Sequence, residues 1–166
     1  MSNAPFLLKR ARWGYRLGDA EVVDSMLQEG LTCAIAGCHM GMTAEEVSRR
    51  YGISRADQDS FAAESQQRAE AAVKSGVFDR ELVPVEVPQR KGPPVRLTRD
   101  EYPRPGTTAE KLGALRAAFA PDGSVTAGNA SGINDGAAAL VVVTDKRAKE
   151  LARKPLARIL AYCTTG

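Results

Sequence analysis

The only histidine of the sequence, His39, is the one side chain that could supply imidazole chemistry, and it stands beside a cysteine. Both belong to the glycine-flanked run of residues 37–41, which reads GCHMG. A cysteine next to a histidine can be an activated nucleophile. Neighbouring residues on an extended chain point to opposite sides, however, so Cys38 and His39 are poorly placed to act on each other. The pattern leaves open whether His39 contacts a ligand or is an ordinary packed or surface residue.

Residues 125–136 are a second candidate site, because small and turn-forming residues are densest there. The run reads VTAGNASGINDG, and its glycines recur every four residues. A loop with so little side-chain bulk lets a ligand approach backbone N–H and C=O groups. A connecting loop before a buried element is the plain alternative, and no phosphate-binding motif of the G-x-G-x-x-G type occurs. The polar groups that could fix a ligand here are Asn129, Ser131 and Asn134.

Three basic side chains could neutralise phosphates, although ordinary surface charge explains them equally well. They are Arg104, Lys111 and Arg116. The cysteines, at positions 33, 38 and 163, make an odd number without C-x-x-C spacing. This argues against a disulfide framework and against a zinc site, so we predict no metal. A reducing cytoplasm is the simplest location for such a chain.

The composition is that of one globular domain, or of one domain and part of another. The 166 residues are 26% charged and 43% hydrophobic, as in ordinary soluble proteins. A net charge of +3 is too small to argue for nucleic acid. A basic run with aromatics over residues 9–16 keeps nucleic-acid binding as a minor alternative. No apolar run is long enough to cross a membrane, and the N-terminus lacks signal-peptide features.

Helices are predicted where apolar residues recur at helical spacing between caps and stops. Asp19 would cap a helix over residues 19–27. Thr43 and Glu46 form a capping-box pattern for a helix that ends near Gly52. Ser54 starts a long helix to about Lys74, with an apolar face that includes Phe61 and Val73. Two more helices are expected over residues 109–119 and 146–152.

Strands are predicted over residues 82–87, 139–144 and 156–162. The first has prolines near it, which suggests a sheet edge. The second is continuously apolar and is expected to be buried. Residues 91–94 should form a turn and residues 98–108 an irregular loop. Together the elements predict an α/β chain in which helices and short strands position the candidate sites.

Four motifs, in their order and mutual spacing, resemble the thiolase family and the acetyl-CoA acetyltransferases in particular. They are MSNAP at residues 1–5, CHMGMTAE at residues 38–45, SRADQD at residues 54–59 and VTAGNASGINDG at residues 125–136. The resemblance extends over essentially the whole chain. It covers well under half of a complete thiolase, and only its middle.

The resemblance implies a thiolase-like α/β fold that is incomplete. In this family a loop domain that covers coenzyme A is inserted into the first of two similar catalytic domains. Residues 1–131 resemble that loop domain, and residues 6–18 resemble the arm that pairs dimers into tetramers. Residues 132–153 resemble the end of the N-terminal core domain. Residues 154–166 resemble the first strand of the C-terminal core domain.

The resemblance also implies which residues contact the substrate, coenzyme A or acetyl-CoA, with no tightly bound cofactor. The pantetheine arm and the loop-domain wall correspond to Leu31, His39 and Met40. The nucleotide end corresponds to Arg104 and Lys111. The pocket wall corresponds to Phe119, Ala127 and Ser131, with Ser131 hydrogen-bonding pantetheine.

No catalytic residue is expected within the chain. Thiolases use a nucleophilic cysteine, a histidine in a Gly-His-Pro motif and a second cysteine in a Cys-x-Gly-Gly-Gly motif, and none of these motifs occurs here. Without nucleophile, base and oxyanion hole the chain alone should be inactive. The expected partners are acyl-CoA thioesters and further copies of the chain, with no nucleic acid and no membrane. A non-catalytic coenzyme-A-binding or assembly module is the alternative.

Overall fold

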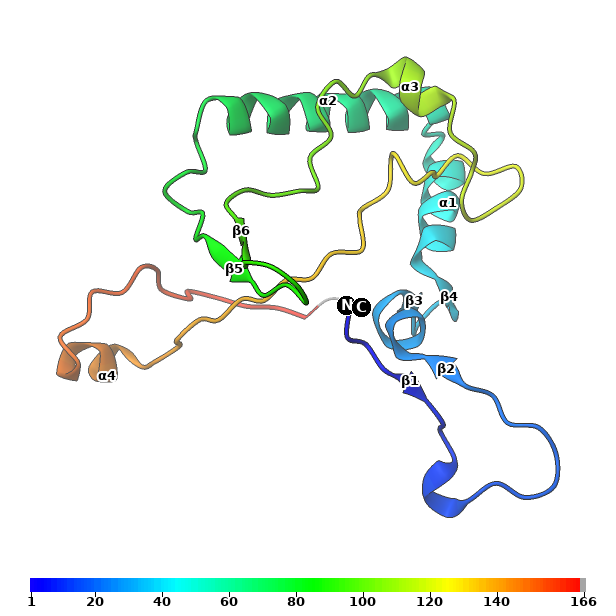
Figure 1. Cartoon of the computed structure of the whole chain (residues 1–166), viewed down its shortest axis with the longest axis horizontal. Helices are drawn as coiled ribbons and strands as arrows, with labels where there is room; N and C mark the ends of the chain where they lie inside the picture. The colour runs from blue at the N-terminus through cyan, green and yellow to red at the C-terminus, as the bar shows by residue number, and fades with distance from the viewer. Residues whose placement is uncertain (165–166) are drawn as a thin grey trace. The chain divides into compact units, whose positions relative to one another are not determined.

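The structure is a computed structural model that describes residues 1–164 (Figure 1). The chain divides into two units. The first unit is Met1–Asn134 and the second is Asp135–Gly166, whose last two residues lie outside the described part. Helices and short two-stranded pairings make up the first unit, as expected for a mixed chain of helices and strands.

The N-terminal segment is a strand pair with a long excursion between its strands. Strand β1, Phe6–Leu7, pairs antiparallel with β2, Val23–Asp24, and a 3-10 helix, Ala11–Trp13, lies between them. The helix predicted over residues 19–27 is wrong. The backbone N–H of Met26 donates to Oδ1 of Asp24 at 2.8 Å, so the helical turn starts only after β2. That turn is a π-helix, Met26–Gly30.

Two strands then lead directly into the first long helix. Strand β3, Thr32–Cys33, pairs antiparallel with β4, Cys38–His39. Helix α1 follows at once as Met40–Tyr51, with His39 as its N-cap. The predicted capping box of Thr43 and Glu46 is therefore wrong, because both residues already lie inside the helix. Thr43 Oγ1 donates to the Met40 carbonyl at 2.6 Å, while Glu46 pairs with Arg49.

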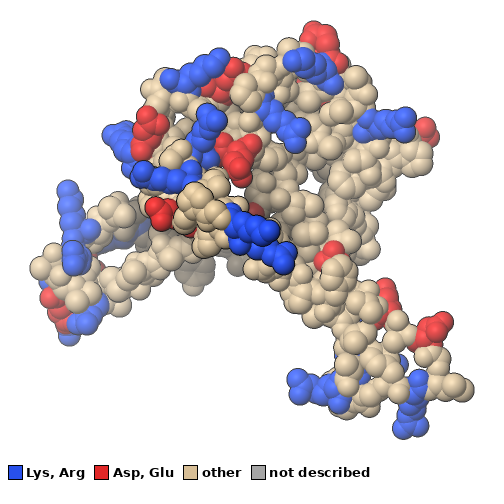
Figure 2. All heavy atoms as spheres, in the orientation of Figure 1, with Lys and Arg blue, Asp and Glu red and all other residues tan. Residues whose placement is uncertain are grey.

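Helix α2, Arg55–Lys74, has the predicted start and end. Ser54 and Asp57 exchange hydrogen bonds as a capping box, and Gly52 ends α1 in the left-handed conformation before it. The predicted apolar face is only partly correct, because Phe61 and Val73 are 76% and 43% exposed. The solvent side of α2 carries ion pairs, and basic and acidic side chains interleave on the face shown in Figure 2.

The chain returns to α2 through a hairpin, a loop and a short helix. Strand β5, Val85–Val87, pairs antiparallel with β6, Val95–Leu97, across the expected turn. The loop after β6 is irregular, as predicted, and helix α3, Ala109–Gly113, packs against α2. The predicted helix over residues 109–119 is too long, because Ala117 forms an antiparallel bridge to Thr126. That bridge requires extended backbone.

The second unit has one helix, α4, Asp145–Glu150, within its described residues, capped by the Thr144 side chain. The strands predicted over residues 139–144 and 156–162 are not formed there. The apolar side chains are exposed instead, at 89% for Leu140 and 90% for Val141. The reason is that no described segment of this unit supplies a pairing strand.

We expect the chain to self-associate through residues 139–143. An exposed apolar segment with unpaired backbone groups is a template for strand pairing between copies. Light scattering after size exclusion should show oligomers whose population rises with concentration, and Val141→Lys should reduce them. A monodisperse monomer with a sharp thermal transition would contradict this expectation.

Candidate functional site

The backbone of residues 124–130 is held on α2 by one buried carboxylate. Asp59 is 3% exposed and accepts from Arg55 Nε at 2.6 Å and from Asn129 Nδ2 at 2.9 Å. Asn129 Oδ1 in turn accepts from the backbone N–H of Thr126 at 2.7 Å, and the Thr126 side chain is fully buried. Asn129, expected to be available to a ligand, is thus occupied in fixing the loop.

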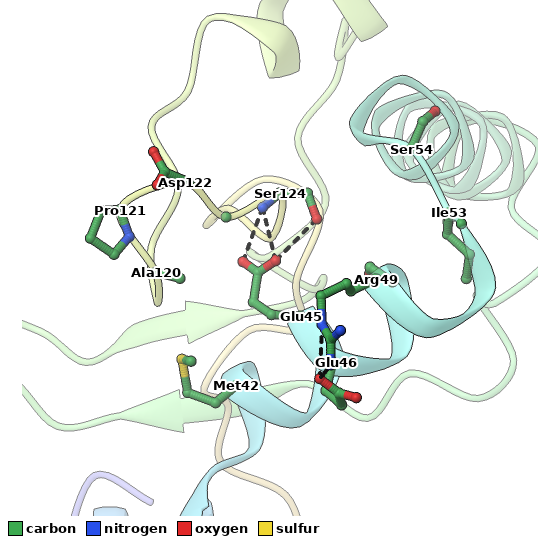
Figure 3. Close-up of a pocket in the computed structure, with 13 residues that line it drawn as sticks. Met42, Glu45, Glu46, Arg49, Ile53, Ser54, Ala120, Pro121, Asp122 and Ser124 are labelled. Carbon is green, nitrogen blue, oxygen red and sulfur yellow. Dashed lines mark hydrogen bonds and ion pairs between the residues drawn. The ribbon is translucent and has the colours of Figure 1, made fainter.

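A second carboxylate, Glu45 on α1, holds the start of the same loop (Figure 3). It accepts from the backbone N–H groups of Ser124 and Val125, both at 2.9 Å, and from the Ser124 hydroxyl at 3.1 Å. Gln58 donates to the same hydroxyl at 2.8 Å. The loop is therefore fastened to both long helices.

The pKa of Glu45 is set by two opposing effects. Partial burial raises it, but the hydrogen bonds from the Ser124 and Val125 backbone and from the Ser124 hydroxyl outweigh burial and lower the pKa below its ordinary value. A carboxyl whose pKa is lower in the folded state stabilises that state above the unfolded pKa. The contribution is lost as the pH falls through the folded pKa.

We therefore expect the Glu45→Gln variant to lose part of the acid sensitivity of the folded chain. Near neutral pH the variant should be less stable than the parent, because the amide makes weaker hydrogen bonds than a carboxylate. The difference should shrink at acid pH, below the ordinary range of a glutamate carboxyl, because the lowered folded-state pKa means that the stabilisation is lost as the parent's Glu45 is protonated there. Urea unfolding from pH 3 to 7 measures this. A difference in unfolding free energy between parent and variant that stays constant from pH 3 to 7 would show that protonation of Glu45 is not linked to folding.

The predicted site residues of the β4–α1 junction converge on one aromatic contact. The rings of His39 and Phe119 stack with centroids 4.9 Å apart and planes at 27°. Gly41 is buried directly beneath the Phe119 ring. The backbone N–H of Met40 donates to the Leu31 carbonyl at 2.8 Å. Leu31, His39, Met40 and Phe119 are therefore brought together, although Phe119 follows the others by about eighty residues.

Arg104 lies on a loop that is hydrogen-bonded to α2, and Lys111 lies in α3, just after this loop. The backbone N–H of Arg104 donates to Gln66 Oε1 at 2.9 Å, and Lys111 Nζ donates to the Gly106 carbonyl at 2.7 Å. Glu70 accepts from the Gly106 N–H at 2.9 Å. Both basic residues are exposed. The structure thus groups these two predicted residues with each other, around Gly106.

Ala127 and Ser131, the remaining predicted residues, are exposed on the glycine-containing loop. The glycines of this loop reduce its side-chain bulk, and they also allow it to pack closely on neighbouring segments. A Cβ on Gly128 would lie 2.6 Å from the side chain of Leu112 on α3, and one on Gly132 would lie 2.4 Å from the Tyr102 ring. The loop is therefore seated against α3 and against the segment before Arg104.

A separate hollow lies between α1 and the turn at residues 120–124 (Figure 3). None of the eight predicted site residues lines it. Its walls include Met42, Glu45, Arg49, Ile53, Pro121 and Asp122. The Glu45 carboxylate in this wall is already engaged by the Ser124 and Val125 backbone.

Within residues 1–164 no three or more histidine, cysteine or acidic side chains are grouped to hold a metal ion. None of the helices in that range has the length and apolar character required to span a membrane. All three cysteines are free thiols.

Comparison with known proteins shows the class to which this fold and loop belong. Residues 1–146 match the family described as "Thiolase, N-terminal domain". The chain is a member of the thiolase family. Its incomplete α/β architecture of helices and short strands agrees with that assignment.

Similar proteins include an acetyl-CoA acetyltransferase of Allochromatium vinosum, 54% identical over the whole chain, and a probable acetyl-CoA acyltransferase of Staphylococcus epidermidis, 53% identical. The solved acetyl-CoA acetyltransferase of Syntrophomonas wolfei superposes with a TM-score of 0.79 at 46% identity and covers 93% of the chain. That of Bacillus anthracis gives a TM-score of 0.77 at 45% identity, over 92% of the chain. The chain spans 42% of the two related sequences and 39% and 38% of the two solved chains.

Proposed function

We propose that this chain carries the coenzyme-A-facing part of an acetyl-CoA C-acetyltransferase. The complete protein would transfer an acyl group between thioesters, forming or cleaving acetoacetyl-CoA, with coenzyme A as substrate and no tightly bound cofactor. The observation that supports this most is the convergence of Leu31, His39 and Met40 with Phe119. The proposed contacts are Leu31, His39, Met40, Arg104, Lys111, Phe119, Ala127 and Ser131.

The contacts divide by chemistry into an apolar and a basic part. The stacked, half-buried His39 and Phe119 rings would give an apolar contact for the pantetheine chain, and the exposed Ser131 hydroxyl gives a hydrogen-bonding group for its amides. Arg104 and Lys111 supply positive charge for the phosphates. Residues 1–131 would be the loop domain of the family, residues 132–153 the end of the first core domain and residues 154–166 the start of the second. The division of the chain after Asn134 supports this boundary.

The N-terminal segment would serve assembly of the complete protein as a dimer of dimers. Residues 6–18 expose large apolar side chains, with Phe6 at 68%, Trp13 at 81% and Leu17 fully accessible. Such side chains on a projecting segment are typical of an interface. A reducing cytoplasm remains our proposed location, supported by the free cysteines.

Titration of the chain with coenzyme A tests the proposed contacts. We expect binding in the millimolar range, with the NMR signals of the His39 ring shifting as coenzyme A is added. Arg104→Ala should weaken binding by roughly 3- to 10-fold at low salt, because one phosphate contact is lost. Arg90→Ala, in the hairpin turn, is the matched control and should leave binding unchanged.

The outcomes of the titration distinguish the two hypotheses, part of an acetyl-CoA C-acetyltransferase and an independent binding module. Micromolar affinity would favour the alternative, an independent coenzyme-A-binding module. A His39 ring that does not respond at millimolar coenzyme A would exclude the proposed contacts. Assays of acetoacetyl-CoA cleavage should show no turnover above background, because the chain has no catalytic cysteine motif. Measurable turnover by the pure chain would refute the proposal that it lacks the catalytic machinery.

A further inference from the structure

Cys33 and Cys38 face each other across the antiparallel pair β3–β4. In an antiparallel pair of strands, opposite residues alternate between pairs that hydrogen-bond to each other and pairs that do not. The Met40 N–H donates to the Leu31 carbonyl, so the pair enclosed by these two residues, Thr32 and His39, is not hydrogen-bonded to each other. The cysteines therefore occupy a hydrogen-bonded pair, whose Cα atoms are about 5.5 Å apart. That Cα separation lies within the range of disulfide bridges, whereas the Cβ atoms of a hydrogen-bonded pair lie farther apart than in an unstrained bridge, so the disulfide would be readily reduced. Directly opposite side chains also project from the same face of a strand pair.

The surroundings of the two thiols leave a small reagent room to reach them. Both cysteines are half-buried, whereas the turn between them is exposed, with Ile35 at 95%. The backbone N–H of Ala36 donates to Cys33 Sγ at 3.4 Å, which holds this sulfur on the side of the turn. Gly37 closes the turn at a φ of 65°. The third cysteine, Cys163, belongs to the other unit of the chain.

We propose that Cys33 and Cys38 are a reversible dithiol–disulfide pair that low-molecular-weight disulfides oxidise. One protein thiolate attacks the small disulfide, forms a mixed disulfide and releases one small thiol. The second protein thiolate attacks the protein sulfur of that mixed disulfide and releases the second small thiol. Two protein thiols are thereby oxidised to one disulfide, and one small disulfide is reduced to two thiols that carry the two protons.

Closure of this ring would restrain the hairpin that carries His39. His39 follows Cys38 directly, caps α1 by accepting from the Gly41 N–H at 2.9 Å and stacks on Phe119. A bridge across the hairpin removes its freedom to twist. Oxidation is therefore expected to change the environment of the His39 ring. As the only histidine, this ring gives a single, unambiguous NMR reporter.

The experiment equilibrates the full chain in glutathione buffers of increasing oxidised fraction, followed by acid quenching, alkylation and mass spectrometry. The reduced chain should take up three alkyl groups, one for each free cysteine. At glutathione ratios that close the bridge before Cys163 is glutathionylated, the oxidised chain should take up one alkyl group, at Cys163, and yield a peptide with Cys33 joined to Cys38. Dithiothreitol should restore full alkylation. The His39 ring signals should move with the same midpoint as disulfide formation.

Two variants keep the test decisive. Cys163→Ser should form the bridge at the same glutathione ratio and show the same His39 shift. Cys38→Ser should stop at a mixed disulfide with glutathione and lack that shift. The proposal is overturned if Cys33 and Cys38 can still be alkylated at a glutathione ratio that is oxidising enough to glutathionylate Cys163. It is likewise overturned if either Cys33 or Cys38 forms a disulfide with Cys163. It is also overturned if the internal bridge forms without moving the His39 signals.

Discussion

The Arg55→Ala substitution is expected to lower the free energy of unfolding of residues 1–134 by about 3–5 kcal/mol. Arg55 is the cationic partner of Asp59, whose carboxylate is almost completely removed from solvent. Without the guanidinium, the buried Asp59 carboxylate keeps the hydrogen bond from Asn129 Nδ2 but has no cation to balance its charge. Arg55 also donates to the carbonyls of Leu112 and Leu115 at 2.8 and 2.9 Å, so the link from α2 to the end of α3 is lost as well.

Urea unfolding followed by circular dichroism at the helix band measures this effect. Arg68→Ala on the same helix is the matched control, because Arg68 and its partner Glu64 are both well exposed. Exposed ion pairs contribute little to stability, so the control should unfold close to the parent. Equal unfolding midpoints for Arg55→Ala and Arg68→Ala would show that the buried network does not hold the first unit together.

The Gly41→Ala substitution is expected to destabilise the first unit by roughly 1–3 kcal/mol, although alanine favours helices. A Cβ at this position would lie 2.4 Å from atoms of the Phe119 ring. Either the ring must leave its stack with His39 or the first turn of α1 must shift. We therefore expect a lower unfolding midpoint together with a change in the NMR signals of the His39 ring.

Gly113→Ala tests whether the effect comes from the close contact rather than from helix composition. Gly113 lies in α3, and a Cβ there would meet no heavy atom within 4 Å. Alanine should be neutral or slightly stabilising at that position. If both substitutions behave alike, and the His39 signals keep their positions in Gly41→Ala, the packing of Phe119 on Gly41 does not determine the geometry of the junction.

Local signals in the sequence were sufficient for some elements and misleading for others. The start of the long helix from Arg55 to Lys74 could be predicted because its signal is local: Ser54 directly precedes the helix and Asp57 lies in its first turn. The same type of pattern at Thr43 and Glu46 predicted the wrong start for α1. The true start of α1 depends on β4 pairing with β3, a tertiary contact that carries the chain into the helix at His39.

Strand formation at residues 139–144 depends on a partner, so an apolar pattern alone could not establish it. The candidate site was predicted from the family resemblance rather than from spacing, and its ligand contacts remain a prediction. The supporting network was missed altogether. The sequence marks Asn129 only as a group that could fix a ligand, because nothing local shows that it meets Asp59, seventy positions away.

The bonds that fix the candidate loop also set an order of events during synthesis. Glu45 bonds to Ser124 across 79 residues, and Asp59 to Asn129 across 70. At roughly 5–20 residues per second, both helices leave the ribosome several seconds before the loop that completes them. During that interval Asp59 can meet Arg55 on its own helix but not Asn129. During these seconds, the surface of α1 and α2 that later binds the loop is exposed to solvent. A chaperone that shields this surface would act in the same interval.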